Sequence, residues 1–178
     1  MRKLALMLAC LFLTLAAFAG SAAVPKAPSI TAAPIAPVSV QRGKAATFEL
    51  DFRVAPGYHI NSSQPHDDFL IPTSLKLDPP SDIVIGKITY PQGRDMSFDF
   101  APDQKINVYA NDVTITGSVR AMSTSPFGTY RVHGELKYQA CDNAACYPPK
   151  TLPVDFDVHV VRAPRAPRRN PAQSPHVH

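Results

Sequence analysis

The sequence predicts an all-β protein with an immunoglobulin-like β-sandwich fold. Three observations indicate this fold: short segments of alternating apolar and polar residues, turn residues between them, and the lack of a sustained helical stripe. The 19 prolines against 8 glycines in 178 residues also argue against long helices. The chain contains no Trp, so the core tryptophan usual in immunoglobulin domains is absent.

The predicted strands alternate with a period of two or are apolar runs bounded by turn residues. They comprise residues 48–54, 83–90, 106–109, 113–120, 130–138 and 152–160. Asn111 and Asp112 are predicted to form the hairpin turn between the third and fourth of these strands. This pattern predicts one sandwich domain over residues 38–161, preceded by a Pro/Ala linker at 24–37.

The first 23 residues are predicted to be a cleaved secretory signal peptide. Arg2 and Lys3 precede an uncharged run at 4–19, which ends in small residues suited to cleavage. An uncleaved anchor would need roughly 20 apolar residues to cross a bilayer. Cys10 lies in this run and would be lost on cleavage, leaving two of the three cysteines in an exported, periplasmic protein.

The basic charge of the chain belongs to its ends. The formal net charge is +4, but residues 162–178 hold four arginines and no acidic residue. Without this tail and the two basic residues of the signal peptide, 12 basic and 14 acidic residues remain. A slightly acidic body is not a nucleic-acid binder, and the Pro-rich tail is expected to be disordered.

The two remaining cysteines lie close together in the sequence. Cys141 and Cys146 are separated by four residues, of which Asp142 and Asn143 favour a turn. A four-residue hairpin loop would place the cysteines opposite each other in an antiparallel pair. Facing Cα atoms there lie about 4.5–5.5 Å apart, which is within disulfide range.

Chemistry alone leaves three roles open for this pair. As a structural staple, a ring of about six residues would contribute only ~2 kcal/mol in the loop-entropy model. A small loop near the surface is well placed for attack by an incoming thiolate, which is the requirement for redox exchange. Two thiolates also make half of a tetrahedral metal site, although no His or Cys at the usual spacing completes it.

The segment around the cysteines resembles a known family. The strings Tyr138-Gln139-Ala140-Cys141 and Cys146-Tyr147-Pro148-Pro149 resemble the active-site segment of the N-terminal periplasmic domain of the thiol–disulfide interchange protein DsbD. The order of motifs agrees over about 70% of the chain. Two weaker matches are Gly57-Tyr58 within residues 54–61, and Pro91-Gln92-Gly93 followed later by Val108-Tyr109.

The resemblance implies an immunoglobulin-like sandwich in which Cys141 and Cys146 are a redox pair. It implies a protein-disulfide reductase, or its electron-transfer module, that needs no cofactor because the sulfurs carry both electrons. The implied partners are thioredoxin-fold periplasmic proteins of the disulfide isomerase or cytochrome c maturation type. This chain has one residue fewer between its cysteines than the family pattern. The family's membrane domain is not expected in this chain, so the resemblance implies that a separate membrane-embedded thiol transporter supplies the electrons.

The resemblance also implies aromatic residues around the pair. The family covers its cysteines with a cap loop that matches residues 94–107, in which Phe98 and Phe100 are the candidates. The alternative is that both are core residues of a strand at 97–100. Phe100 is favoured as the cap because residues 101–103 are expected to end that strand. The tyrosines expected to flank the pair are Tyr58, Tyr138 and Tyr147.

Other polar residues give weaker signals. A polar cluster near the Gly57 turn has no spacing typical of a metal site, and its members are His59, His66, Asp67 and Asp68. Asn61-Ser62-Ser63 is a formal glycosylation sequon.

The predicted function is periplasmic thiol–disulfide exchange, with Cys146 as the attacking residue because the following prolines hold its side of the loop exposed. One alternative is a non-catalytic partner-binding sandwich with a structural disulfide. Another is metal handling in the cell envelope.

Overall fold

The structure is a computed structural model that describes residues 30–164. The predicted signal peptide and most of the arginine-rich tail lie outside these residues. Every helix or strand between Ile30 and Pro164 is a β-strand, so the all-β prediction is confirmed. No helix in this part of the chain has the length and apolar character needed to cross a membrane. The strands are β1 (Ile30–Ala32), β2 (Val38–Gln41), β3 (Ala45–Val54), β4 (His59–Asn61), β5 (Ser74–Asp78), β6 (Ile83–Thr89), β7 (Arg94–Phe98), β8 (Ala101–Tyr109), β9 (Asp112–Ala121), β10 (Gly128–Tyr138), β11 (Ala140–Cys141), β12 (Lys150–Pro153) and β13 (Phe156–Val161).

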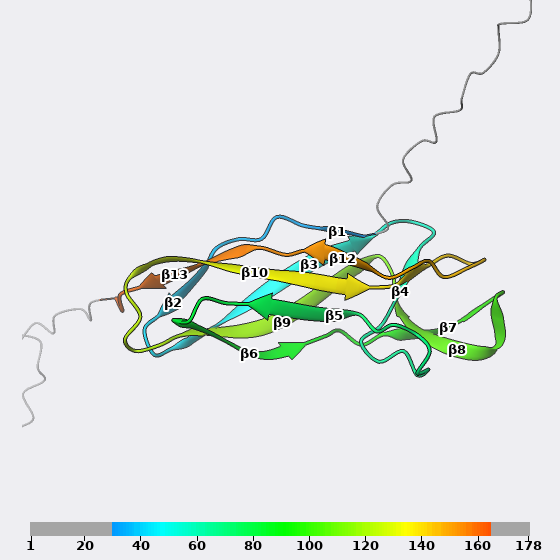
Figure 1. Cartoon of the computed structure of the whole chain (residues 1–178), viewed down its shortest axis with the longest axis horizontal. Helices are drawn as coiled ribbons and strands as arrows, with labels where there is room; N and C mark the ends of the chain where they lie inside the picture. Colours follow the sequence, from blue (N-terminus) through cyan, green and yellow to red (C-terminus); the bar gives the residue numbers. More distant parts are fainter. Residues whose placement is uncertain (1–29, 165–178) are drawn as a thin grey trace, which may run out of the picture.

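Two large sheets face each other and form the sandwich (Figure 1). One sheet has the order β1-β3-β9-β6, and the other has the order β12-β10-β13-β2, with β5 also paired to β10. The predicted period of two in β3 is confirmed, since its Phe, Leu and Val side chains alternate as buried residues with exposed polar ones. The Phe48 ring of β3 meets the Phe156 ring of β13 between the sheets, with centroids 5.1 Å apart.

The segment predicted as one strand at residues 152–160 forms two strands, β12 and β13, which both pair with β10. β12 pairs with the end of β10 and β13 pairs with its beginning, with a break at Val154 and Asp155. The amide of buried Val154 still donates to the carbonyl of Gly134, 2.9 Å away.

The first strand of the described residues, β1, lies within the segment that was expected to be a linker at residues 24–37. Its Ile30 is buried in the main core, opposite Val54.

The predicted hairpin between residues 106–109 and 113–120 is wrong. β8 pairs with β4 and β7, whereas β9 pairs with β3 and β6. Asn111 does turn the chain, with a φ of 62°, but its carbonyl accepts a hydrogen bond from the amide of Val54 at 2.7 Å. The turn is therefore a corner at which the chain leaves one sheet and enters another.

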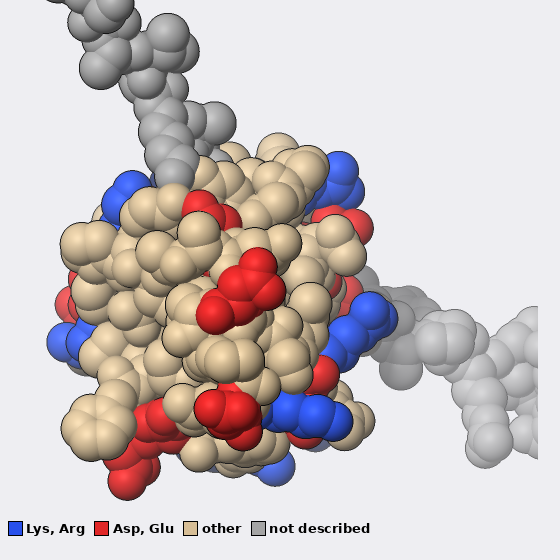
Figure 2. Space-filling view, turned by 90° about the vertical axis from the view of Figure 1, so that its right-hand side faces the viewer, with Lys and Arg blue, Asp and Glu red and all other residues tan. Residues whose placement is uncertain are grey.

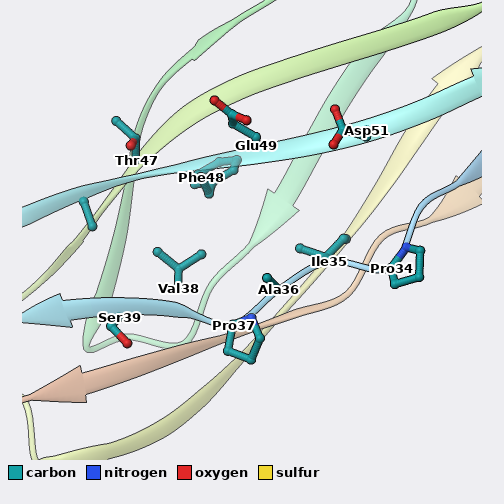
Figure 3. A pocket seen from close by; sticks show the side chains of 11 residues that line it. Pro34, Ile35, Ala36, Pro37, Val38, Ser39, Thr47, Phe48, Glu49 and Asp51 are labelled. Atoms are coloured by element: carbon teal, nitrogen blue, oxygen red, sulfur yellow. The ribbon is translucent and has the colours of Figure 1, made fainter.

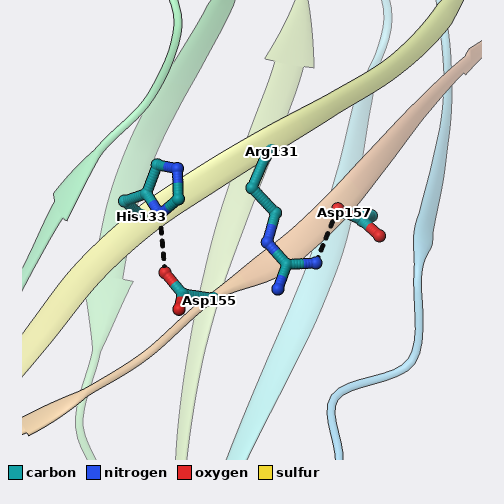
Figure 4. A network of polar contacts seen from close by, with 4 residues as sticks. All are labelled: Arg131, His133, Asp155 and Asp157. Carbon is teal, nitrogen blue, oxygen red and sulfur yellow. Dashed lines mark hydrogen bonds and ion pairs between the residues drawn. The ribbon is translucent and has the colours of Figure 1, made fainter.

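The outer face of β10 and β13 carries two ion pairs (Figure 4). Arg131 Nη1 lies 3.0 Å from Asp157 Oδ1, and His133 Nδ1 lies 2.8 Å from Asp155 Oδ1. These side chains are largely exposed, and exposed pairs contribute about 0–1 kcal/mol each. The apolar core between the sheets is therefore the main source of stability.

A third, smaller sheet with the order β11-β4-β8-β7 lies at one end of the sandwich, on the right in Figure 1. It has a small apolar core of its own, built from Phe98, Ile106 and Val108 with Leu70 and Phe100 packed against them. Its central strand β4 is buried on both faces: Ile60 belongs to the main core, and His59 stacks on Phe98 of the small core. This sheet carries Cys141.

Candidate redox site

The two cysteines form a disulfide across a tight hairpin, as predicted. Cys141 and Cys146 are paired as an antiparallel bridge, with Cα atoms 4.0 Å apart. The hairpin is closed by the amide of Asp142, which donates to Ala145 O at 3.0 Å. A second bond runs from the amide of Tyr147 to Ala140 O at 2.9 Å. The backbone of the loop is therefore held independently of the sulfur–sulfur bond.

Asp142 fixes the conformation of the loop between the cysteines. Its Oδ1 accepts hydrogen bonds from the amides of Ala144 and Ala145 at 2.9 and 3.0 Å. Its Oδ2 accepts one from the hydroxyl of Tyr147. An Asp side chain that bonds to amides two and three residues later is a known turn-stabilising arrangement. The loop therefore presents the disulfide in one defined geometry.

The two sulfurs differ in accessibility. The side chain of Cys141 is 0% exposed, and its strand β11 pairs with β4. Cys146 follows the turn and is partly exposed. Attack on a disulfide requires access to one sulfur. Cys146 is therefore the more accessible residue of the pair.

Two stacked aromatic rings lie beside His59, the residue that pairs with Cys141 across the strands. The Phe98 ring stacks on the His59 ring with centroids 3.9 Å apart, and Phe100 stacks on Phe98 at 5.4 Å. Of the strand at 97–100 that was the alternative, only Ser97 and Phe98 belong to β7, and residues 101–103 begin β8; both rings pack in the small core, as that alternative expects. Phe100 lies in the turn between them, so Phe98, and not Phe100, contacts the residue opposite Cys141.

His59 is a buried neutral histidine beside the pair. It is the direct cross-strand partner of Cys141 and is only 4% exposed. Burial lowers the pKa of His59 to about 4, an effect that the nearby carboxylate of Asp142 partly opposes. At pH 7 the ring therefore carries no charge and offers one nitrogen lone pair.

A hydrogen-bond network joins the disulfide loop to the rest of the site. Gln139 Oε1 accepts bonds from Asn61 Nδ2 at 3.0 Å and from the amide of Ile71 at 3.2 Å. Gln139 Nε2 donates to the carbonyl of Tyr147 at 3.2 Å. One side chain thus connects β4, the loop after it and the residue that follows Cys146.

Replacing Gln139 with Leu is expected to lower the free energy of unfolding by about 2 kcal/mol. The change leaves Ile71 N and Tyr147 O without this partner and removes one bond of Asn61, in a partly buried network. Urea unfolding of the oxidised protein at pH 7 measures the effect. The matched change Gln104→Leu on exposed β8 should cost less than about 0.5 kcal/mol. Equal costs for the two variants would show that the network adds no stability.

The three predicted tyrosines occupy different environments. The rings of Tyr58 and Tyr147 lie together beside the loop, with centroids 6.1 Å apart. Tyr138 is buried in the main core. Two of the three tyrosines therefore shape the surface around Cys146.

The predicted polar cluster is not a cluster in the structure. His59 stacks beneath Phe98, whereas His66 lies 3.6 Å from Asp95. Asp67 accepts a bond from the amide of Phe69. Between residues 30 and 164 there is no group of three His, Cys, Asp or Glu side chains that could hold a metal ion. The sequon residue Asn61 is fully buried, so its amide is inaccessible in the folded chain.

Sequence reasoning missed the roles of His59, Asn61, Gln139 and Asp142. Gln139 lies within the family string, which was a usable signal. Asp142 was recognised only as a turn former. His59 and Asn61 are in a three-residue strand with both faces buried, which has no alternation to read.

A separate groove lies away from the cysteines (Figure 3). It has a volume of about 650 Å³ between the β1–β2 connection and β3. Its lining comprises residues 34–39, 46–49 and 51, none of which belongs to the small sheet. The candidate redox site is therefore a surface hairpin separate from this groove.

The sequence matches the protein family described as "Thiol:disulfide interchange protein DsbD, N-terminal" over residues 27–157. No sequence among the curated proteins matches the chain. Among solved structures, the Neisseria meningitidis DsbD N-terminal domain in the reduced form is 22% identical, with a TM-score of 0.39. That match covers 62% of this chain and 74% of the other.

The N-terminal periplasmic domain of ScsB from Proteus mirabilis is 15% identical, with a TM-score of 0.47, and the match covers 72% of this chain and 44% of that one. A complex of the DsbD and PilB N-terminal domains from Neisseria meningitidis matches at 20% identity and a TM-score of 0.38, covering 62% of this chain and 73% of that one. Because the family match spans most of the residues, cysteine hairpin included, the chain belongs to the family of the N-terminal domain of thiol:disulfide interchange protein DsbD.

Proposed function

We propose that this protein exchanges thiols and disulfides with other proteins through Cys141 and Cys146. The carrying observation is a disulfide that closes a short hairpin, in which Cys146 is partly exposed and Cys141 is buried opposite a His59 ring stacked on Phe98. Membership of the DsbD N-terminal family supports the same function. The two sulfurs hold both electrons, so the exchange runs without a cofactor.

The asymmetry of the pair supports an order of steps. In the reduced protein, the Cys146 thiolate attacks the disulfide of an oxidised partner, forms a mixed disulfide and releases one partner thiolate. Cys141 then loses its proton, and its thiolate attacks the Cys146 sulfur. The bond between Cys146 and the partner breaks, and the partner leaves with its second thiolate. The partner gains two electrons, and this protein returns to the disulfide form.

The alternative roles of the pair have less support. The hairpin is already closed by two backbone hydrogen bonds, and a ring this small restricts the unfolded chain by only ~2 kcal/mol. A partner-binding sandwich with an inert disulfide would not need one sulfur accessible and the other covered. Metal handling would need further ligands around the thiolates, and the described residues supply no such group.

The site supports a proposal about partners and location. We expect oxidised thioredoxin-fold proteins of the periplasm, of the disulfide isomerase or cytochrome c maturation type, to receive the electrons. A membrane-embedded thiol transporter on a separate chain would return the protein to its dithiol form. The predicted signal peptide at residues 1–23 is consistent with a periplasmic location.

The end of the molecule that carries the small sheet is acidic. Figure 2 faces this end, and acidic side chains lie across its middle and lower part, with basic ones around the margin. Its loops contain Asp67, Asp68, Asp99 and Asp142. Phe69, in the same loop as the first two, is 94% exposed. A partner with a basic rim and an apolar contact beside its own disulfide fits this surface.

Thiol transfer from the purified reduced protein tests the proposal. When the reduced protein is mixed with an oxidised thioredoxin-fold protein, the second protein should be converted to its dithiol form. Alkylation of free thiols followed by mass spectrometry measures this conversion. The reduction potential should lie above about −300 mV, the region of inert structural disulfides. A potential well below that value, together with no transfer, would refute the proposed exchange.

Replacing Phe98 with Ala is expected to speed reduction of the disulfide by glutathione on the order of tenfold, because it should open Cys141 to attack in addition to Cys146 and access controls exchange. Phe98 is 5% exposed and covers the His59 ring opposite Cys141. The rate of disulfide reduction at pH 7 is measured by quenching samples at successive times and alkylating the free thiols. Phe127→Ala is the matched control, since Phe127 is an exposed ring stacked under Arg42 outside the small sheet. An unchanged rate in Phe98→Ala would show that the ring does not shield the pair.

A further inference from the structure

His59 has an unusual position for a histidine. It pairs directly with Cys141 in the antiparallel register of β4 and β11. Directly opposite residues of an antiparallel pair project to the same face, with Cβ atoms about 4.5–5.5 Å apart. The ring of His59 and the sulfur of Cys141 are therefore neighbours on the face that Phe98 covers.

One nitrogen of this ring has no partner in the disulfide form. Within residues 30–164, His59 Nε2 is buried and makes no hydrogen bond. Buried polar atoms are nearly always paired, and an unpaired one destabilises the folded state. The surroundings of the ring offer little else, since one face is covered by Phe98 and the neighbouring disulfide sulfur has no hydrogen to donate.

Reduction supplies the missing donor. When the disulfide opens, two electrons and two protons convert the sulfurs to thiols, and the Cys141 thiol gains an S–H group in the same buried space. We propose that His59 Nε2 accepts a hydrogen bond from this thiol, and that the bond stabilises the dithiol form of the protein relative to the disulfide form. The ring then carries its own proton on Nδ1.

The charge state of the ring is suited to this role. Burial keeps the pKa of His59 at about 4, so the ring is neutral and Nε2 is free to accept at the pH of the periplasm. Asp142 is the acidic group that acts on it, and Phe98 is the apolar group that shields it. A neutral hydrogen bond to Cys141 also favours the protonated state of that thiol. Cys146 is then the sulfur that becomes the nucleophile.

This inference rests on the proposed function, in which the dithiol is the working form. His59 acts through Cys141 and is a positioning residue. Its effect is on the balance between the two redox forms, so it sets how readily the protein takes up electrons and how readily it passes them on.

The equilibrium with glutathione tests the inference without any protein partner. In wild type, two glutathione molecules reduce the disulfide and leave as glutathione disulfide. In His59→Phe, which keeps an aromatic ring against Phe98, the equilibrium constant for this reduction should fall roughly fivefold, the effect of one neutral hydrogen bond. At 29.6 mV per tenfold change, the potential becomes more negative by about 20 mV. His133→Phe, the same change on the outer face of β10, should leave the constant unchanged.

Nitrogen NMR of the wild-type histidines is the second measurement, and it needs no variant. The His59 Nε2 resonance should shift on reduction as the atom accepts the new bond, while the His133 resonances stay in place. The inference would be overturned if the equilibrium constant for reduction of His59→Phe by glutathione were within twofold of the wild-type constant. A His59 Nε2 resonance that does not move on reduction would also overturn it. Because neither measurement involves a protein partner, failed transfer to thioredoxin-fold proteins would count against the proposed function alone.

Discussion

A Cys141→Ala variant is expected to accumulate a stable mixed disulfide with an oxidised thioredoxin-fold partner, whereas Cys146→Ala should form none. The partly exposed sulfur of Cys146 is the one within reach of a partner, and the Cys141 side chain is 0% exposed. Without Cys141 no second thiol is available to release the partner, so the first exchange product persists. Both variants should fail completely in multiple-turnover transfer.

Non-reducing gel electrophoresis after acid quenching, followed by mass spectrometry of the linked peptides, measures the trapped species. Wild type mixed with the same partner is the control and should show only a trace of it. Trapping by Cys146→Ala with none by Cys141→Ala would reverse the assignment of attacking and resolving residues. If neither variant traps a partner, the pair does not act by exchange.

The parts of the fold that could be predicted from sequence are those with local signals. β3 alternates buried and exposed residues along its length because one face packs on the core and the other meets solvent. The cysteine hairpin could be predicted because Asp142 and Asn143 favour a turn and four residues fit a hairpin loop. In both cases the information lies within ten residues of chain.

The errors concern contacts between distant segments. A turn at Asn111 was foreseen, but a turn residue does not say which strand lies next to the one that follows it. Here β9 pairs with β3, whose residues precede it by more than fifty positions. The positions of Phe98 and Phe100 depend in the same way on where β7 ends. The turn that ends β7 lies at Asp99 and Phe100, so the ring before the turn packs inward on His59.

The site itself was only partly predictable. The sulfur pair has a sequence signature, whereas the residue opposite a cysteine depends on the register between β4 and β11. His59 and Cys141 are separated by 81 intervening residues, and a buried three-residue strand has no periodicity to place it. The position of His59 beside buried Cys141 could therefore be identified only from the folded structure.

Stability is expected to fall by about 3 kcal/mol between pH 7.5 and pH 4 on account of His59 alone. Its pKa is about 4 in the folded protein and 6.5 in its ordinary, unfolded state. Between these values the unfolded chain binds more protons than the folded one, so the contribution is complete above pH 6.5 and is lost as the pH falls toward 4. Below pH 4 it should level off, because both states are then protonated.

Urea unfolding of the oxidised wild type and of His59→Phe across this range isolates the effect from other titrating groups. The difference in free energy of unfolding between the two proteins should change by about 3 kcal/mol, with wild type losing more as the pH falls. Parallel curves for wild type and His59→Phe would mean that the ring titrates normally in the fold. The predicted loss of stability between pH 7.5 and pH 4 would then have no support.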